Sequence, residues 1–183
     1  MLEDRIQKNL LGAGELFIYS LWLQSQMTDL IILSKHPKIR KRFVSRPQKI
    51  PATLRIERMK YWRKDFGVIR QEFEKEFAGS ISVEAQSDLR RVYNLRNAIA
   101  HSYVSLARDY FLYRPSGKGA RTRKLAKEFG VTKKADSAKP TLFKISFADD
   151  APYLSMFAVM QRLDTVHLRS FADKLGIPHS RIR

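Results

Sequence analysis

The sequence contains no cysteine and only four histidines among its 183 residues. A chain without cysteine forms no disulfide, holds no thiolate zinc site and has no cysteine nucleophile. The histidines are scattered along the chain and make a poor set of metal ligands, so we expect neither a metal nor any other cofactor. Any chemistry then has to come from other polar side chains.

Long hydrophobic runs are also missing. Residues 1–4 lack the basic start of a signal peptide, and the apolar stretch 16–33 is interrupted by Gln24, Gln26 and Asp29. A helix that spans a membrane needs about 20 predominantly apolar residues. We therefore expect a cytoplasmic protein that does not enter a membrane.

Negative charge is scarce relative to positive charge. The chain has 35 Lys and Arg residues against 18 Asp and Glu residues, which gives a formal net charge of +17. An excess of this size attracts polyanions at long range, and RNA is the first such partner to consider. Solubility alone is the alternative, although a small domain usually needs a net charge of only about 2 to 8 for it.

Apolar residues at three- and four-residue spacings are abundant, which is the pattern of amphipathic helices. The pattern predicts helices over about 2–33, 52–78, 80–106 and 152–175. Prolines in the basic connector 35–49 favour extended or turned backbone there. Because 183 residues with 44% apolar content suit one core, we expect a single all-α domain over 1–183, a bundle of four to five helices.

The region 113–150 departs from the helical pattern and reads as a basic insertion. Between residues 114 and 139, nine Lys and Arg residues stand against two acidic ones. Residues 141–147 partly alternate in polarity, which predicts one short strand or a hairpin. Long loops are usually functional or mobile, so we expect phosphate contacts here, with a solvated loop as the alternative. The candidates for these contacts are Arg121, Arg123, Lys124, Lys127, Lys133 and Lys134.

The chemically most specific segment is 95–102, which places Arg96, the neighbouring amide Asn97 and His101 on one helix. In this segment a four-residue spacer separates the Arg from the His, and a polar residue follows the Arg directly. This pattern resembles the motif of the HEPN superfamily of all-helical domains. The resemblance covers this motif and the general helical character, and the basic segment after Tyr113 lies outside it. It implies a metal-independent ribonuclease in which two chains pair and bring two motifs together in a basic cleft. Many members of the family act as toxins or in antiviral defence, which implies an antitoxin or a defence protein as a further partner.

The same residues suit RNA cleavage without metal on chemical grounds. An imidazole accepts or donates a proton near neutral pH, and a guanidinium binds phosphate oxygens in a bidentate fork. We expect His101 to transfer protons, Arg96 to stabilise phosphoryl charge, and Asn97 to position His101 or the scissile group. Because one His cannot easily be acid and base at once, we expect a symmetric homodimer with two copies of His101. The products would be a 2′,3′-cyclic phosphate and a 5′-hydroxyl.

Helical geometry complicates this assignment. A separation of five residues puts Arg96 and His101 about 140° apart on a continuous helix, so they do not share a face. Arg90, Asn94, Asn97 and His101 instead form one polar stripe, and Arg90 and Asn94 join the RNA-binding candidates. Either Arg96 curls round to the phosphate or the helix breaks near the motif, and the sequence leaves both open.

Other functions fit the same residues. Asn97 and His101 could hydrogen-bond across a helix pair while Arg96 pairs with an acid, so that the motif supports folding only. The chain would then be a non-catalytic RNA- or ribosome-binding module, or a regulatory partner in a toxin-antitoxin pair. Tyr61, Trp62, Tyr110 and Tyr113 lie close to basic residues and are candidates to stack on unpaired bases. Trp62, however, falls in the apolar arc of its predicted helix and is expected in the core.

Overall fold

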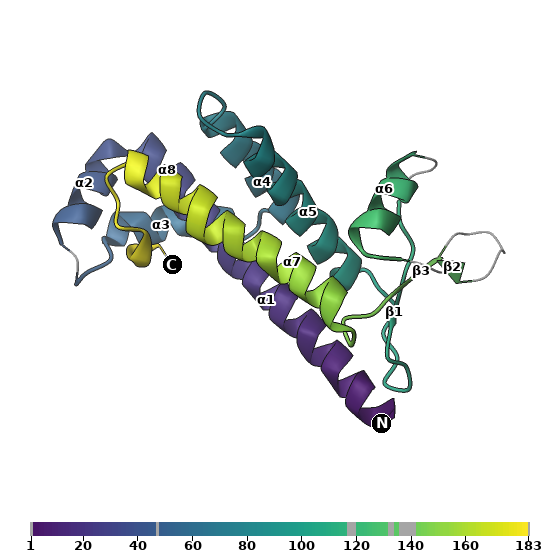
Figure 1. Cartoon of the computed structure of the whole chain (residues 1–183). Helices are drawn as coiled ribbons and strands as arrows, with labels where there is room; N and C mark the ends of the chain where they lie inside the picture. The colour runs from purple at the N-terminus through teal and green to yellow at the C-terminus, as the bar shows by residue number, and fades with distance from the viewer. Residues whose placement is uncertain (1, 47, 117–119, 132–133, 136–141, 183) are drawn as a thin grey trace. The chain divides into compact units, whose positions relative to one another are not determined.

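The computed structural model describes residues 2–46, 48–116, 120–131, 134–135 and 142–182. Helices dominate, as Figure 1 shows, which confirms the predicted all-α class. The chain divides into two compact units: unit 1 is Met1–Ser20 with Arg90–Val159, and unit 2 is Leu21–Leu89 with Met160–Arg183. Three helices belong partly to each unit, namely α1 (Leu2–Lys35), α5 (Val83–Ala100) and α7 (Asp150–Arg162).

The first predicted helix, 2–33, is present as α1, which continues without a break through two glycines. Gly12 lies in a close approach, because a Cβ there would be 3.2 Å from the Cβ of Phe147 and 3.3 Å from the ring of Tyr153, so that one of these neighbours would have to shift. Among the described residues, α1 is the one helix long and apolar enough to cross a membrane by length and composition. Of its most apolar window, 61% is buried inside the protein, as is usual for a core helix.

Unit 1 combines helices with a small antiparallel sheet. The strands β1 (Phe111–Tyr113), β2 (Lys134–Ala135) and β3 (Leu142–Ile145) are ordered β1-β3-β2. The short strand predicted within 141–147 is therefore present as β3, and it has a partner on each side. Sequence analysis missed the helix α6 (Ala120–Glu128). α6 ends where Gly130 adopts a φ of +61° and the N–H of Val131 donates to the carbonyl of Ala126 at 2.8 Å.

Unit 2 is built around four aromatic rings. Phe73, Phe77 and Phe171 contact one another with ring centroids 4.7 to 5.2 Å apart, and Phe66 is fully buried. Around this core lie the ends of α1, α5 and α7 that belong to the unit and the following shorter elements: α2 (Pro37–Ser45), α3 (Ala52–Tyr61), α4 (Phe66–Glu76), the π-helix η1 (Leu163–Leu168), α8 (Arg169–Lys174) and the 3-10 helix η2 (His179–Arg181).

Three predictions for unit 2 were wrong. The connector 35–49 was expected to be extended or turned, but α2 forms there because Pro37 occupies the first helical turn, where a missing N–H costs nothing. The predicted helix 52–78 is interrupted by a turn between α3 and α4. Trp62 lies in that turn with 78% of its surface exposed, since α3 buries Leu54 and Tyr61 instead. Trp62 is therefore not a core residue.

The predicted helix 80–106 is shorter than expected. The hydroxyl of Ser82 accepts the N–H of Ala85 at 3.1 Å and caps the N-terminus of α5. The helix ends at Ala100, so Tyr103 and Leu106 lie beyond it and are 84% and 79% exposed. The apolar arc of α5 thus stops before the end of the motif.

Candidate functional site

α5 separates a buried apolar side from a polar side within unit 1. Val92, Leu95 and Ala98 are at most 1% exposed. On the polar stripe Arg90 and His101 are exposed, whereas Asn94 and Asn97 are half-buried. The stripe therefore meets solvent most fully at its two ends, and His101 is at the C-terminal end.

His101 is the first residue after α5. Its backbone N–H donates to the carbonyl of Asn97 at 3.0 Å, and the hydroxyl of Ser102 donates to the carbonyl of Ala98 as the chain turns away. The imidazole is exposed and makes no hydrogen bond or ion pair with any residue that the structure describes. The helix thus ends at the motif, and no described hydrogen bond or ion pair holds the imidazole in one rotamer.

Arg96 is held on another side of α5. Its side chain is half-buried, and the guanidinium carbon lies 5.6 Å from the ring centroid of Phe17 on α1, within unit 1. This is cation–π distance, and it fixes the long side chain by packing. Within the described part of the chain no hydrogen bond joins the side chains of Arg96 and His101. The continuous-helix geometry predicted this separation.

The loop that follows His101 is anchored at both ends. Tyr103 and Leu112 exchange backbone hydrogen bonds of 2.7 and 3.0 Å, N–H to carbonyl in both directions. At the far end, Asp109 accepts a hydrogen bond of 2.7 Å from Nε of Arg5. Asp109, and Asp149 after it, raise the pKa of the Arg5 guanidinium above its usual value because they bind its charged form. The loop therefore holds a defined position beside the end of α5.

The polar stripe is tied to α6 through Asn94. Its amide Nδ2 donates to Oε2 of Glu128 at 2.9 Å. Leu125 on α6 and Phe129 just after the helix are both buried, and they lie one helical turn apart on the side that carries Glu128. This contact gives Asn94 a structural role in addition to the RNA contact predicted for it.

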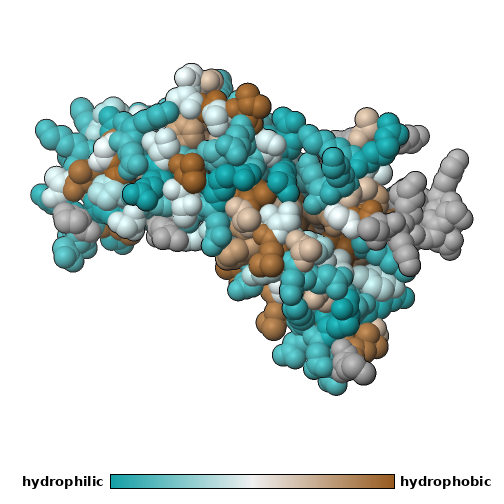
Figure 2. All heavy atoms as spheres, viewed as in Figure 1, coloured by the Kyte–Doolittle hydropathy of each residue, from teal (hydrophilic) through white to brown (hydrophobic). Residues whose placement is uncertain are grey.

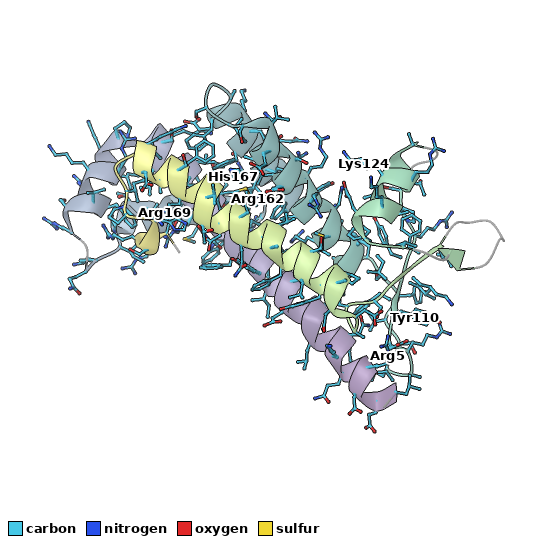
Figure 3. All side chains as sticks on the ribbon, in the orientation of Figure 1. Arg5, Tyr110, Lys124, Arg162, His167 and Arg169 are labelled. Atoms are coloured by element: carbon cyan, nitrogen blue, oxygen red, sulfur yellow. The ribbon has the colours of Figure 1, made fainter. Side chains whose placement is uncertain are left out.

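The basic insertion candidates are only partly described. Arg123, Lys124 and Lys127 are exposed on α6, where Figure 3 shows Lys124 projecting from the helix. The backbone of Arg121 belongs to α6, and the backbone of Lys134 in β2 pairs with Phe143 in β3. The side chains of these two residues are not among those that the structure describes. Lys133 lies outside the described residues altogether. The three described cations face solvent and are available to phosphates.

Of the predicted stacking residues in unit 1, Tyr110 has the most suitable surroundings. It is half-buried beside β1 (Figure 3), with Nζ of Lys144 at 4.9 Å and the guanidinium carbon of Arg108 at 5.8 Å from its ring centroid. Tyr113 is only 8% exposed and belongs to the core. Tyr110 thus combines an aromatic face with two cations.

The other histidines serve structure or face solvent. His167 is 8% exposed, with Nε2 3.6 Å from Asp88, and His179 Nε2 lies 3.0 Å from Oε1 of Gln26 and 3.2 Å from Asp164. His36 is 45% exposed. None of the three is preceded by an Arg and an amide at the spacing found before His101.

A second concentration of positive charge lies in unit 2 and extends well beyond the basic connector that was expected over 35–49. Between residues 35 and 64 there are twelve Lys and Arg residues and one Glu, a local net charge of +11. This exceeds the +7 of residues 114–139. A count of charge in a sliding window would have found its full extent, whereas the search for an insertion outside the helical pattern did not.

Comparison with known proteins adds no identification: the chain matches no family model, and no curated protein and no solved structure is similar enough to count as a match.

Proposed function

We propose that this chain is a metal-independent endoribonuclease of HEPN type, with Arg96, Asn97 and His101 as its catalytic residues. The observation that carries the proposal is the exposed imidazole of His101 just after the C-terminal end of α5, which makes no hydrogen bond or ion pair with a described residue. A structural histidine in a folded domain is normally hydrogen-bonded, as His179 is. His101 is therefore better suited to a ligand than to the fold.

The proposed reaction is an attack of the RNA 2′-hydroxyl on the adjacent phosphorus. One imidazole accepts the proton of the 2′-hydroxyl as the new P–O bond forms. The bond from phosphorus to the 5′-oxygen breaks, and a second imidazole donates the proton that the leaving oxygen requires. The ends are a 2′,3′-cyclic phosphate and a 5′-hydroxyl, and no electron acceptor or metal enters the balance.

Arg96 supplies positive charge to the phosphoryl oxygens in this scheme. The guanidinium of Arg96 is packed against Phe17, whereas the imidazole of His101 is exposed. We therefore expect the His101 side chain to move when the two groups meet at one phosphate. Asn97 lies one helical turn before His101 and positions the imidazole or the scissile group. The exposed Arg90 extends the stripe toward further phosphates.

A second copy of the chain is part of the proposal because each chain provides one His101. The cleavage rate should then rise with the square of protein concentration below the dimer dissociation constant. A setting in the cytoplasm, in toxin-antitoxin or antiviral defence, belongs to the same proposal, with an antitoxin or defence protein as partner. Of the most apolar window of α1, 61% is buried inside the protein, which fits a function away from the membrane.

The test is cleavage of mixed RNAs by the purified chain in excess EDTA, with the fragment ends identified. We expect cyclic phosphate and 5′-hydroxyl ends, and a loss of about 100-fold or more in rate for His101→Ala. His36→Ala is the matched control, since it also removes an exposed histidine and should cleave like the parent chain. Circular dichroism establishes that both variants fold. Unchanged cleavage by His101→Ala would remove the assignment.

One observation favours a second candidate, a non-catalytic RNA- or ribosome-binding module. The guanidinium of Arg96 lies over Phe17, which is a packing contact that a purely structural Arg would make. A module of this kind binds RNA in a salt-sensitive way and leaves it intact in the same assay.

A further inference from the structure

Both tryptophans of the chain line one cavity in unit 2. The cavity has a volume of about 490 Å³, and its walls include Trp22, Tyr61 and Trp62. Trp62 is 78% exposed, which is unusual for the largest side chain in a folded protein. Burial, and next the charge of Glu72, raises the pKa of Tyr61 to about 12, and its phenol is hydrogen-bonded to Glu72, so Tyr61 offers the cavity its ring. We call this cavity the aromatic pocket.

Two buried polar atoms at the aromatic pocket have no hydrogen-bond partner among the described residues: Oε1 of Gln24 and Nη1 of Arg181. The amide Nε2 of Gln24 donates a hydrogen bond to the carbonyl oxygen of Lys64 at 3.5 Å. The Oε1 of the same amide remains an unpaired acceptor. Because nearly all buried polar atoms in proteins are paired, an unpaired acceptor and an unpaired donor on two residues of one cavity wall mark side chains that would gain hydrogen bonds by turning toward a ligand. That ligand is flat enough to stack on indole and carries both donors and acceptors at its edge, as a nucleobase does.

A second cavity in unit 2 is lined by cations. It measures about 400 Å³, and Arg42, Arg46 and Lys49 line it together with the first residues of α3, Ala52 and Thr53. No side chain caps the N-terminus of α3. Three cations around a cavity make an anion site, and the open amides of a helix N-terminus strengthen it. We call this cavity the basic pocket.

The two pockets are neighbours along the chain and through Arg181. Lys49 and Pro51 line the basic pocket, whereas Ile50 between them lines the aromatic pocket. Arg181, in the wall of the aromatic pocket, donates from Nη2 to the carbonyl of Arg46 at 3.2 Å and lies 3.9 Å over the ring of Phe43. A nucleotide chain likewise carries a phosphate next to each base.

The charge around the pockets is largely uncompensated. Eight cations between residues 35 and 64 make no ion pair with any residue in the described ranges. Figure 2 shows predominantly hydrophilic residues over the end of unit 2 that carries α2. These eight cations are Lys38, Arg40, Lys41, Arg42, Arg46, Lys49, Arg55 and Arg63.

We propose that unit 2 binds single-stranded RNA, with one base stacked on Trp62 in the aromatic pocket and neighbouring phosphates in the basic pocket. The choice of RNA rests on the proposed function, and the site deepens it by naming the part of the chain that holds the substrate. Bases stack on exposed aromatic side chains without regard to sequence, and cations track the phosphates. The site is separate from Arg96 and His101, which belong to unit 1.

The experiment uses the full chain with His101→Ala, in EDTA, so that cleavage cannot alter the probe. The probe is a fluorescently labelled oligouridylate of twelve residues, and its anisotropy gives the affinity. Trp62→Leu should weaken binding by about tenfold or more, while Trp62→Phe should retain most of it because phenylalanine still stacks. Thermal unfolding of each variant should match the parent, since Trp62 is exposed.

The contribution of the basic pocket is measured as the salt dependence of binding. The combined variant Arg42→Gln, Arg46→Gln and Lys49→Gln should lower the slope of log K against log salt by about 2. The control is the combined variant Lys75→Gln, Arg169→Gln and Lys174→Gln, which removes three exposed cations of the same unit that line neither pocket. The control should retain the parent slope.

A polyanion without bases separates stacking from charge. Heparin should compete for the basic pocket but leave the tryptophan fluorescence unquenched, whereas unlabelled oligouridylate should quench it, because Trp22 and Trp62 are the only indoles. Equal quenching by heparin, unchanged affinity of Trp62→Leu, or an equal loss of slope in the control would each overturn the proposal. Cleavage by the parent chain with unchanged binding by Trp62→Leu refutes this site alone. Trp62-dependent binding without cleavage refutes the nuclease alone.

Discussion

Removal of Arg58 should destabilise unit 2 more than removal of the charge on Asp29. Asp29 is 4% exposed, and its carboxylate accepts hydrogen bonds of 2.7 and 2.5 Å from Nε and Nη2 of Arg58. The Arg58 side chain is 28% exposed, so water reaches it if its partner is lost. Burial raises the pKa of Asp29, and the hydrogen bonds and charge of Arg58 oppose that rise. The two partners are therefore not equivalent.

The expected costs follow from what each variant leaves behind. Arg58→Ala leaves a buried carboxylate without a counter-charge, which costs about 3 to 5 kcal/mol at pH 7. Asp29→Asn leaves a neutral amide that still accepts a hydrogen bond and a guanidinium that water can reach, so it should cost about 1 kcal/mol. Lys60→Ala is a control at the exposed pair with Glu57 and should cost less than about 1 kcal/mol.

The pH dependence has a definite sign. The pKa of Asp29 is raised above its ordinary value of 3.8 in the folded chain. Between pH 3.8 and the folded-state pKa, the folded chain therefore binds a proton at Asp29 that the unfolded chain has lost. This stabilisation is complete below pH 3.8 and is lost as the pH rises through the folded-state pKa. Arg58→Ala removes the groups that lower this pKa and moves the window upward. The variant should therefore be less destabilised at pH 5 than at pH 7.

The assay is urea unfolding followed by far-UV circular dichroism at pH 5 and pH 7. The parent chain and the three variants are compared at both pH values, so that the general effect of pH cancels. Equal losses for Arg58→Ala and Asp29→Asn at pH 7, or a cost of Arg58→Ala that does not fall at pH 5, would refute the reasoning.

Two further predictions concern backbone conformation and phenol ionisation. Gly176→Ala should lower stability by about 1 to 2 kcal/mol in thermal unfolding, because Gly176 closes α8 at a φ of +66°, whereas Gly14→Ala, inside α1 with open space around it, should be neutral or stabilising. Tyr61 and Tyr153 should ionise near pH 12 in a titration followed at 295 nm. Burial raises the pKa of each phenol to about 12, and a neighbouring glutamate, Glu72 for Tyr61 and Glu15 for Tyr153, adds to the rise. Their contribution to stability is complete below about pH 10 and is lost as the pH rises through about 12, and a titration in which all phenols ionise near pH 10 would contradict it.

Long periodic segments were the part of the fold that the sequence predicted well. α1 was expected over 2–33 and spans Leu2–Lys35, because its apolar residues recur without a proline to stop them. The polar and apolar sides of α5 also follow from spacing alone, and so does the separation of Arg96 from His101. Each of these depends on local geometry, which a helix fixes within a few residues.

The errors arose where tertiary packing decided the outcome. Ile56, Met59 and Trp62 continue the spacing of the buried residues on α4, but the turn before Phe66 rotates α3 so that these three face solvent. α6 has few apolar residues and was not expected to be helical. It is held by Leu125 and by Glu128, which accepts a hydrogen bond from Asn94 far away in the sequence. Such partners are not visible in a single sequence.

The uneven distribution of charge favours the proposal that the chain binds a polyanion over the alternative that the charge serves solubility alone. Residues 35–64 carry a net charge of +11 and residues 114–139 carry +7, so the rest of the chain has a net charge of −1. Solubility is served by charge spread over the whole surface, whereas this chain concentrates its excess in residues 35–64 and residues 114–139. Phosphates that bind at both segments would add their salt dependence, because each releases its own counterions. If both segments bind phosphates as proposed, the loss of one should reduce the salt slope of RNA binding without abolishing it.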